Sequence, residues 1–249
     1  MKPRVLLLSG WAHGREALAP LAERLAAFCA PTVRSVHELA RTADATDCTV
    51  AGPSIYARGL AALAAEEPGG WDVLAGWSMG AVVAIEAAAA ATVRPGRLAV
   101  LAGTPCFCRA EGWTSGAAPQ TVRAMRAALR TAPETVLRRF FADAAFPRVL
   151  TADAAQARAH TALAWGTEEL SRGLDYLAAT DLRGQLAGLT VPLLAVHGRQ
   201  DRIVPWQAGE ALAAGRGRLV LREEDGHDLA AGDPAALAAA IEHLLSEKR

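Results

Sequence analysis

Short apolar runs alternate with longer segments of helical periodicity along most of the chain. Short runs of this kind are typical of buried strands. They occupy residues 5–9, 32–36, 72–75, 98–101, 193–196 and 219–221. Segments with helical spacing of apolar positions lie between them, at residues 16–27, 55–65, 81–91, 207–214 and 234–246. Strands that alternate with helices predict an α/β fold, with a mostly parallel sheet of about six strands covered by helices on both faces.

The alternation stops between residues 104 and 183. Helical patterns continue there, and they are broken by Pro105, Pro119, Pro133 and Pro147. We interpret this segment as a helical lid inserted between two strands of the sheet. The predicted organisation is therefore a core formed by residues 1–103 and 184–249, and a lid formed by residues 104–183.

A glycine-rich pentapeptide, Gly76-Trp77-Ser78-Met79-Gly80, joins the predicted strand 72–75 to the alanine-rich predicted helix 81–91. A G-x-S-x-G sequence in that context is typical of a nucleophile elbow, a sharp turn that holds its serine under backbone strain. Small residues must flank the serine, and Gly76 and Gly80 meet this need. Glycines beside a serine also occur in ordinary turns, so the role of Ser78 depends on its partners elsewhere in the chain.

The partners that a nucleophilic serine requires are present downstream. A serine hydroxyl is a weak nucleophile, so it needs a base, and the base needs a carboxylate that fixes its tautomer. In folds with a nucleophile elbow these residues follow in the order serine, acid, histidine. Asp201 follows the predicted strand 193–196, and His227 lies between the predicted strand 219–221 and the last helix. We therefore predict a catalytic triad of Ser78, Asp201 and His227.

Other aspartates and histidines compete for these roles. The rival acids are Asp175, Asp181, Asp225 and Asp228. The first two precede the strand that leads to Asp201, and the last two are too close to His227 in sequence to orient its ring easily. His197 ends that same strand, where hydrogen bonding within the loop is a better interpretation than the role of base. The remaining histidines are expected to be surface or packing residues: His13, His37, His160 and His243.

Two backbone N–H groups must also stabilise the oxyanion of a tetrahedral intermediate. Met79 directly follows the nucleophile, and Trp11 follows the predicted strand 5–9. We predict that the N–H groups of these two residues form the oxyanion hole. For Trp11, an ordinary aromatic side chain that covers a strand end is the alternative.

Composition limits the class of protein further. The chain has 249 residues, of which 52% are hydrophobic and 21% charged, which suits one sizeable α/β domain with an insertion. The 26 Lys and Arg residues balance 26 Asp and Glu residues, so no net charge favours binding to nucleic acid. No C-x-x-C pair occurs among the cysteines, for which we expect reduced structural thiols and no metal site. They are Cys29, Cys48, Cys106 and Cys108.

The N-terminal residues and the apolar stretches indicate in which compartment of the cell the protein is expected. Residues 1–4 lead directly into the predicted strand 5–9, without the apolar segment and cleavage site of a secretory signal. The alanine-rich stretch 81–91 contains Glu86 and is too short to span a bilayer. We expect a cytoplasmic, monomeric protein without a membrane segment.

Arginines cluster in the predicted lid, at Arg123, Arg126, Arg130, Arg138 and Arg139. The spacing of the first three, i, i+3 and i+7, predicts that they share one helical face, with the other two on the next segment. A solvated helix face paired with Glu134 or Asp143 is the ordinary explanation. The alternative is a docking surface for an acidic carrier.

With these motifs, the sequence resembles the α/β-hydrolases and, among them, the BioH-type carboxylesterases that cleave pimeloyl-acyl carrier protein methyl ester in biotin synthesis. The elbow and the triad are general to the superfamily. Further local matches are Gly10-Trp11, Thr104-Pro105-Cys106-Phe107 and residues 173–177 and 180–183. The Pro-Cys-Phe segment and the stretch around residues 181–183 are the narrower ones among these matches.

The sequence also departs from the pattern of that family. Ser9-Gly10 stands in place of His-Gly after the first strand, and residues 37–41 stand in place of an Asp-x-x-Gly-x-Gly-x-Ser loop. The chain begins at what would be the third strand of the full fold, so we expect no N-terminal hairpin.

The resemblance implies a serine carboxylesterase that needs no cofactor. Its expected partner is an acyl carrier protein that carries the substrate, and small esters are the other expected substrates. The resemblance also implies an acyl channel and a carrier-binding arginine, Arg138 or Arg139. The channel residues would be Trp11, Trp77, Met79 and Phe140. For Trp77 and Phe140, ordinary core packing is the alternative. Other hypotheses are a short-chain carboxylesterase or thioesterase, a lyase similar to the menaquinone-pathway synthase, and a non-catalytic ligand-binding protein.

Overall fold

The computed structural model describes residues 1–43, 52–67, 69–214 and 217–247, so Cys48 lies outside the described residues. Within them, six strands form one parallel sheet in the order β2-β1-β3-β4-β5-β6. The strands are β1 (Arg4–Leu8), β2 (Ala30–Arg34), β3 (Val73–Trp77), β4 (Leu98–Leu101), β5 (Leu193–Gly198) and β6 (Gly217–Arg222). Central strands are buried on both faces, which explains why they are continuous apolar runs.

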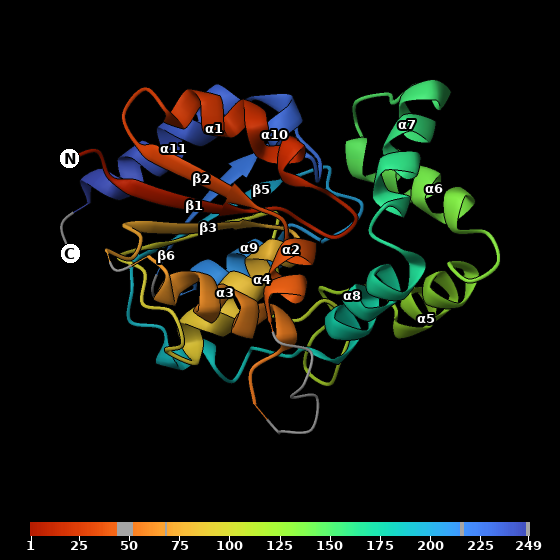
Figure 1. The fold of residues 1–249 in the computed structure, drawn as a ribbon, viewed down its shortest axis with the longest axis horizontal. Helices are drawn as coiled ribbons and strands as arrows, with labels where there is room; N and C mark the ends of the chain where they lie inside the picture. Colours follow the sequence, from red (N-terminus) through yellow and green to blue (C-terminus); the bar gives the residue numbers. More distant parts are fainter. Residues whose placement is uncertain (44–51, 68, 215–216, 248–249) are drawn as a thin grey trace.

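Helices cover both faces of the sheet (Figure 1). One face packs against α1 (Ala19–Leu25), α10 (Leu229–Gly232) and α11 (Pro234–Ser246). The other packs against α2 (Val36–Thr42), α3 (Ile55–Ala65), α4 (Met79–Ala89) and α9 (Gln207–Ala213). Short 3-10 turns occupy Arg15–Leu18 and Leu186–Gly188. The predicted α/β class, with a six-stranded parallel sheet between helices, is confirmed.

The second strand and the helix after it differ from the sequence prediction. The strand expected at residues 32–36 ends at Arg34, because Ser35 and Glu38 form a capping box that starts α2. The Ser35 Oγ accepts from the His37 N–H at 3.3 Å, and Glu38 Oε2 accepts from the Ser35 N–H at 2.8 Å. His37 therefore lies in the first turn of a helix that the apolar pattern did not reveal.

Four helices between β4 and β5 lie together beyond one end of the sheet (Figure 1). They are α5 (Pro119–Ala128), α6 (Pro133–Ala145), α7 (Ala152–Leu163) and α8 (Thr167–Ala179). Pro119 and Pro133 each stand at a helix start, where a missing N–H costs nothing. We use the name lid for residues 104–183, which contain these helices.

The register of the parallel strands brings several loops to one edge. Leu8 pairs with Gly76, and Trp77 pairs with Leu101, so β1, β3 and β4 end side by side. The carboxyl ends of parallel strands form the usual binding edge of an α/β sheet. In this protein the edge faces the lid, and the segments that contain Trp11, Ser78 and Asp201 follow directly from it (Figure 1).

Candidate active site

Ser78 occupies the sharp turn between β3 and α4. Its backbone lies at φ 57° and ψ −122°, a conformation that costs a residue with a side chain about 1–3 kcal/mol. The turn is possible because its flanking glycines touch backbone: a Cβ on Gly80 would lie 2.5 Å from the Leu8 carbonyl oxygen, and one on Gly76 would collide with the Gly80 carbonyl. This turn places Ser78 in the wall of a cavity, described below.

His227 bridges Ser78 and Asp201. Its Nε2 lies 2.8 Å from Ser78 Oγ, and its Nδ1 lies 2.8 Å from Asp201 Oδ2. Because a carboxylate accepts from Nδ1–H, Nε2 is left free to accept the Ser78 proton. The His227 side chain is fully buried, and Ser78 is 8% exposed. The structure thus brings the three predicted triad residues into one hydrogen-bonded chain.

The Asp201 carboxylate is held by further donors. Oδ1 accepts from the N–H groups of Ile203 and Val204 at 2.8 and 2.9 Å. His197 Nε2 lies 3.2 Å from Oδ2 and 3.0 Å from the Val204 carbonyl oxygen. Burial would raise the pKa of Asp201, but the charge of His227 and the hydrogen bonds from His197 and His227 outweigh it and hold this pKa well below its usual range. His197 therefore supports the acid and does not reach the serine.

The predicted oxyanion donors lie beside Ser78. Met79 begins α4 directly after Ser78, and Trp11 follows Gly10 in the loop after β1. A Cβ on Gly10 would lie 2.9 Å from Ser78 Cβ, so this loop passes very close to the serine. Among the described residues, neither the Trp11 nor the Met79 backbone N–H donates to another protein group. Two unpaired donors beside the nucleophile fit the requirement for an oxyanion hole.

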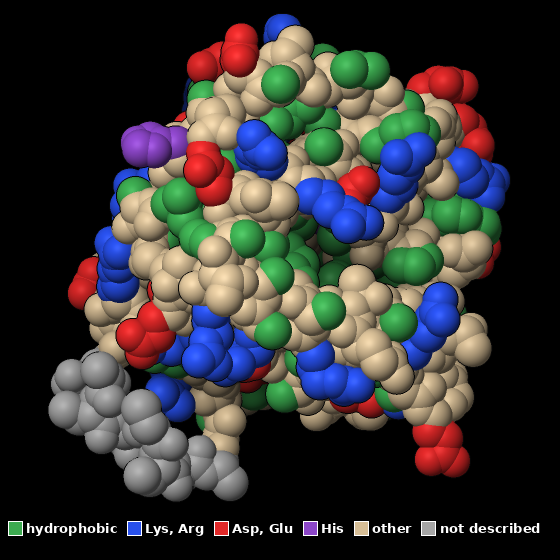
Figure 2. All heavy atoms as spheres, turned by 90° about the vertical axis from the view of Figure 1, so that its right-hand side faces the viewer, with side chains coloured by type: hydrophobic (Ala, Val, Ile, Leu, Met, Phe, Trp, Pro, Cys, Tyr) green, Lys and Arg blue, Asp and Glu red, His purple; other side chains and the backbone are tan. Residues whose placement is uncertain are grey.

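A cavity of about 420 Å³ opens above Ser78 between the core and the lid. Its wall is mostly apolar, with Arg139, Asp143 and Arg202 as the charged members. The other lining residues are Trp11, Ser78, Phe107, Ala117, Thr121, Val122, Ala124, Met125, Ala128, Val136, Phe140, Leu174, Leu177 and Ile203. The lid side of the molecule is hollowed, with hydrophobic side chains in the hollow and basic ones beside it (Figure 2). The cavity suits a substrate with an apolar chain.

Of the four predicted channel residues, the structure brings Trp11 and Phe140 into the cavity wall, with their rings 4.8 Å apart in an edge-on contact. Trp77 and Met79 do not line it. Trp77 points to the opposite face of the sheet, where its Nε1–H donates to the His227 carbonyl oxygen at 2.8 Å. The Met79 side chain is buried in the core. Trp77 is thus a support for the histidine loop, which corrects its predicted position in the channel.

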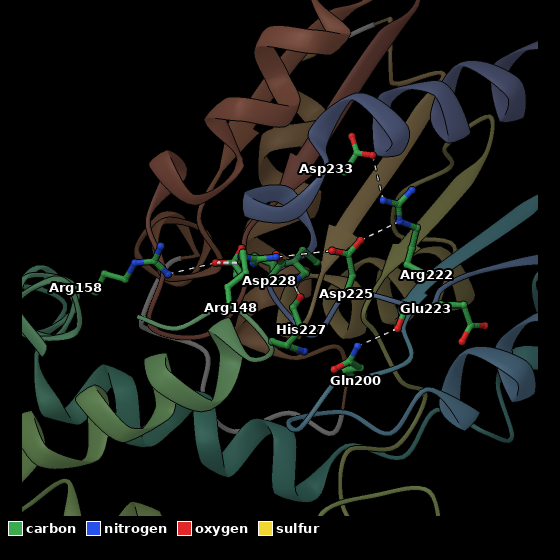
Figure 3. Close-up of polar contacts among 10 residues, drawn as sticks. Arg148, Arg158, Gln200, Arg222, Glu223, Asp225, His227, Asp228 and Asp233 are labelled. Carbon is green, nitrogen blue, oxygen red and sulfur yellow. Dashed lines mark hydrogen bonds and ion pairs between the residues drawn. The ribbon is translucent and has the colours of Figure 1, made fainter. Parts of the chain in front are cut away.

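Ion pairs hold the loop that carries His227 (Figure 3). Arg158 of α7 contacts Asp228 Oδ2 at 3.2 Å, and Arg148, which follows α6, donates to the Asp228 carbonyl oxygen. On the core side, Arg222 contacts Asp225 at 2.9 Å. The rival acids Asp225 and Asp228 thus pair with arginines and leave the His227 ring to Asp201. Sequence reasoning missed Arg148 and Arg158, because they lie far from their partners in the chain.

The predicted lid arginines are distributed over two helices and a turn. α5 ends at Ala128, so Arg130 lies beyond it, and the expectation that Arg123, Arg126 and Arg130 share one helical face is wrong for Arg130. Arg126 pairs with Asp175 at 2.5 Å. On α6, Arg138 donates to Gln156 at 3.3 Å, and Arg139 lies 3.9 Å from Asp143. The side chains at the surface are Arg123, Arg130, Arg138 and Arg139.

Three further features concern cofactors and membranes. The described cysteines, Cys29, Cys106 and Cys108, are free and buried. Across the described ranges, no three His, Cys, Asp or Glu side chains gather as metal ligands. No described helix combines the length and apolarity that crossing a membrane requires.

Comparison with known proteins identifies the family. The model of the alpha/beta hydrolase family matches residues 5–240. The chain belongs to the alpha/beta hydrolase family. A solved structure similar to this hydrolase is a bromoperoxidase from Bacillus anthracis, with a TM-score of 0.84 at 18% identity, covering 99% of this chain and 93% of the other. That similarity concerns the fold alone.

Two relatives of this hydrolase are named pimeloyl-[acyl-carrier protein] methyl ester esterase. The protein of Xylella fastidiosa (strain 9a5c) is 30% identical over 254 residues, which cover 98% of this chain and 95% of the relative. The protein of Stenotrophomonas maltophilia (strain K279a) is 32% identical over 250 residues, which cover 98% and 93%. The expected resemblance to these carboxylesterases is confirmed, and the comparisons agree with the predicted class of carboxylic ester hydrolase.

Proposed function

We propose that this hydrolase is a serine carboxylesterase that cleaves the methyl ester of pimeloyl-acyl carrier protein in biotin synthesis. The observation that carries the chemistry is the His227 ring, which lies 2.8 Å from both Ser78 Oγ and Asp201 Oδ2. The names of the two relatives support the substrate. We keep the expectation of a monomeric, cytoplasmic enzyme as part of this proposal.

The proposed reaction has two halves. His227 Nε2 takes the proton of Ser78 as Oγ attacks the ester carbonyl carbon, and the N–H groups of Trp11 and Met79 stabilise the oxyanion. The carbonyl re-forms, the bond to the methoxy oxygen breaks, and His227 protonates this oxygen, so methanol leaves and an acyl-Ser78 remains. His227 then deprotonates a water that attacks the acyl carbon, the bond from this carbon to Ser78 Oγ breaks, and His227 returns the proton to Oγ as the free carboxylic acid departs. Asp201 stabilises the imidazolium in both halves.

The cavity supports an acyl chain as the group bound next to the ester. Ser78 lies at its base, and Trp11, Phe140 and Leu174 are among the apolar side chains of its wall. A methylene chain gains free energy from burial against such side chains, about 0.8 kcal/mol for each CH₂ group that leaves water. An extended acyl chain would run from Ser78 through this cavity toward the surface of the lid.

The lid surface supports a negatively charged carrier as the group at the far end of the chain. Arg139 lines the cavity and its side chain is 87% exposed, and the neighbouring Arg138 is exposed too. We propose that these arginines, with Arg123, Arg126 and Arg130 around them, form the docking surface for acyl carrier protein. Of these, Arg126 already pairs with Asp175, so its contribution should be smaller.

The test is the hydrolysis of two esters by wild type and by Ser78→Ala. One ester is pimeloyl-carrier methyl ester, and the other is p-nitrophenyl butyrate, which has no carrier. We expect the wild type to hydrolyse both, with the higher kcat/KM on the carrier-linked ester, and Ser78→Ala to lose on the order of 10⁴-fold or more in kcat on each. Circular dichroism of the variant controls for folding.

Each other outcome points to a different hypothesis. Turnover that survives Ser78→Ala would contradict the proposed nucleophile. Ser78-dependent activity on small esters alone would indicate a general short-chain carboxylesterase or thioesterase. From the carrier-linked ester, release of the carrier thiol in place of methanol would indicate a thioesterase, and products of an elimination would indicate a lyase. Ligand binding without any turnover would indicate a non-catalytic protein.

A further inference from the structure

A buried histidine contacts the loop that contains Trp11. We call residues 9–14, which follow β1, the oxyanion loop. The Ala12 N–H donates to His37 Nε2 at 3.0 Å, and the His37 side chain is fully buried. Ala12 lies at φ 62°, which is unfavourable for a residue with a Cβ and persists only where the surroundings hold it. The hydrogen bond to His37 therefore helps to hold the backbone of Ala12 in this conformation.

The acceptor role of His37 Nε2 determines where the ring carries its proton. Since Nε2 accepts from a backbone N–H, the proton of the neutral ring resides on Nδ1. His37 Nδ1 lies 3.1 Å from Glu169 Oε1, so the proton points at a carboxylate. A buried carboxylate therefore fixes the orientation and the tautomer of a histidine whose other nitrogen holds the oxyanion loop.

Glu169 belongs to lid helix α8 and is itself well held. It is 9% exposed, and it accepts from the Tyr56 hydroxyl at 3.2 Å and from Arg172 at 2.7 Å. Burial raises the pKa of Tyr56, and the Glu169 carboxylate raises it further, so this hydroxyl keeps its proton and remains a donor. A buried charge with this many donors is costly to move.

Helix α8 also contacts the oxyanion loop directly, at two points. The Trp11 Nε1–H donates to the Leu170 carbonyl oxygen at 2.8 Å. Gly173, one turn further along the helix, packs against the same indole, because a Cβ there would lie 2.7 Å from Trp11 Cδ1. The lid helix thus holds both the side chain of Trp11 and, through His37, the peptide N–H that follows Trp11.

We propose that His37 and Glu169 are positioning residues, which couple lid helix α8 to the oxyanion hole by fixing the peptide that follows Trp11. The inference rests on the proposed function, since it assigns Trp11 N–H as an oxyanion donor. If the coupling is lost, substrate still binds in the cavity, but one donor no longer points at the oxyanion. A donor misplaced by about 1 Å lowers the rate by one to two orders of magnitude.

Two polar substitutions of His37 separate positioning from packing. In His37→Gln the side-chain carbonyl oxygen reaches the place of Nε2 and still accepts from Ala12, whereas the shorter side chain of His37→Asn reaches only the place of Nδ1. For His37→Asn we expect kcat for p-nitrophenyl butyrate to fall about 10- to 100-fold with KM within about twofold of wild type. For His37→Gln we expect kcat within about threefold of wild type. Equal kcat values in the two variants would overturn the proposal.

A transition-state analogue gives a second readout. An alkyl boronic acid forms a tetrahedral adduct with Ser78 whose oxygen occupies the oxyanion hole, so its affinity should fall in His37→Asn by the same factor as kcat. Glu169→Leu should behave like His37→Asn, because it frees the His37 ring to turn. An unchanged boronate affinity in both variants would overturn the coupling.

The matched control is Tyr176→Phe. Tyr176 also lies on α8 and also donates to a carboxylate of the core, Glu86 at 2.8 Å, but it does not touch the oxyanion loop. We expect kcat within about twofold of wild type. If kcat fell as far in Tyr176→Phe as in His37→Asn, any weakening of the contacts of α8 would be enough to slow the reaction. That result would contradict the specific role of His37. If the wild type hydrolysed no ester at all, the proposed function would fail first, independently of these variants.

Discussion

The core and the lid of this hydrolase hold their polar side chains differently. In the core, His227 contacts both Ser78 and Asp201 at 2.8 Å, and all three side chains are buried or nearly so. In the lid, Arg139 is 87% exposed and lies 3.9 Å from a carboxylate on its own helix. Reaction chemistry requires fixed distances, whereas docking of a charged partner tolerates mobile side chains. The two regions therefore suit bond cleavage and substrate choice respectively.

The lid nevertheless supports the core chemistry where the two meet. Arg158 of the lid contacts Asp228 beside His227, and Glu169 of the lid contacts the oxyanion loop through His37. The lid thus contains two kinds of charged residue: those that contact groups of the core, such as Arg158 and Glu169, and those that stay exposed, such as Arg139. Substitutions should separate these two kinds by the substrates that they affect.

The largest effect is expected in the core, from Asp201→Asn. The amide cannot accept the His227 Nδ1–H while it also keeps the bonds from Ile203 and Val204, so His227 adopts the wrong tautomer or turns. We expect kcat to fall on the order of 10³- to 10⁴-fold on carrier-linked and small esters alike. Steady-state kinetics on both esters measures this, and a loss below tenfold on either would contradict the role of Asp201.

The site on the core was predictable because it depends on short local signals. A G-x-S-x-G turn and residues after strand ends identify Ser78, Asp201 and His227, and parallel strands bring such ends to one edge. The position of Trp77 was predictable too, but by another signal. Side chains alternate along a strand, so Trp77 shares a face with Val73 and Ala75, away from the cavity.

The lid contacts were not predictable in this way. His37 and Glu169 are 132 residues apart, and Arg158 and Asp228 are 70 residues apart. No periodicity links residues at such distances, and a buried histidine looks in sequence like a packing residue. The capping box of Ser35 and Glu38 would have predicted the helix at His37, but not its partner.

A smaller effect is expected at the boundary of the two regions, from His13. The ring is buried against Trp77 and Phe141, and burial lowers the pKa of His13 to about 4 from 6.5. Between pH 6.5 and about pH 4, His13 is protonated in the unfolded chain but not in the folded protein. The free energy of unfolding is therefore highest at neutral pH and decreases as the pH falls from 6.5 to about 4.

His13→Leu removes this proton uptake. Between pH 7 and pH 5, the free energy of unfolding of the wild type should decrease by about 2 kcal/mol more than that of the variant. Urea denaturation at both pH values measures the difference. The same pH dependence in the two proteins would contradict the burial of a neutral His13 between core and lid.

The smallest effect is expected from the exposed arginines of the lid, and it is measured as a ratio of two catalytic efficiencies. This ratio tests the division between core and lid most directly. The measurement is kcat/KM for pimeloyl-carrier methyl ester divided by kcat/KM for p-nitrophenyl butyrate, at low salt, in wild type and in Arg138→Glu/Arg139→Glu. We predict that charge reversal lowers this ratio by roughly tenfold through the carrier-linked ester, while the small ester is hydrolysed at the wild-type rate. An unchanged ratio, or an equal loss on both esters, would contradict the account in which the core cleaves the ester and the exposed arginines of the lid select the carrier.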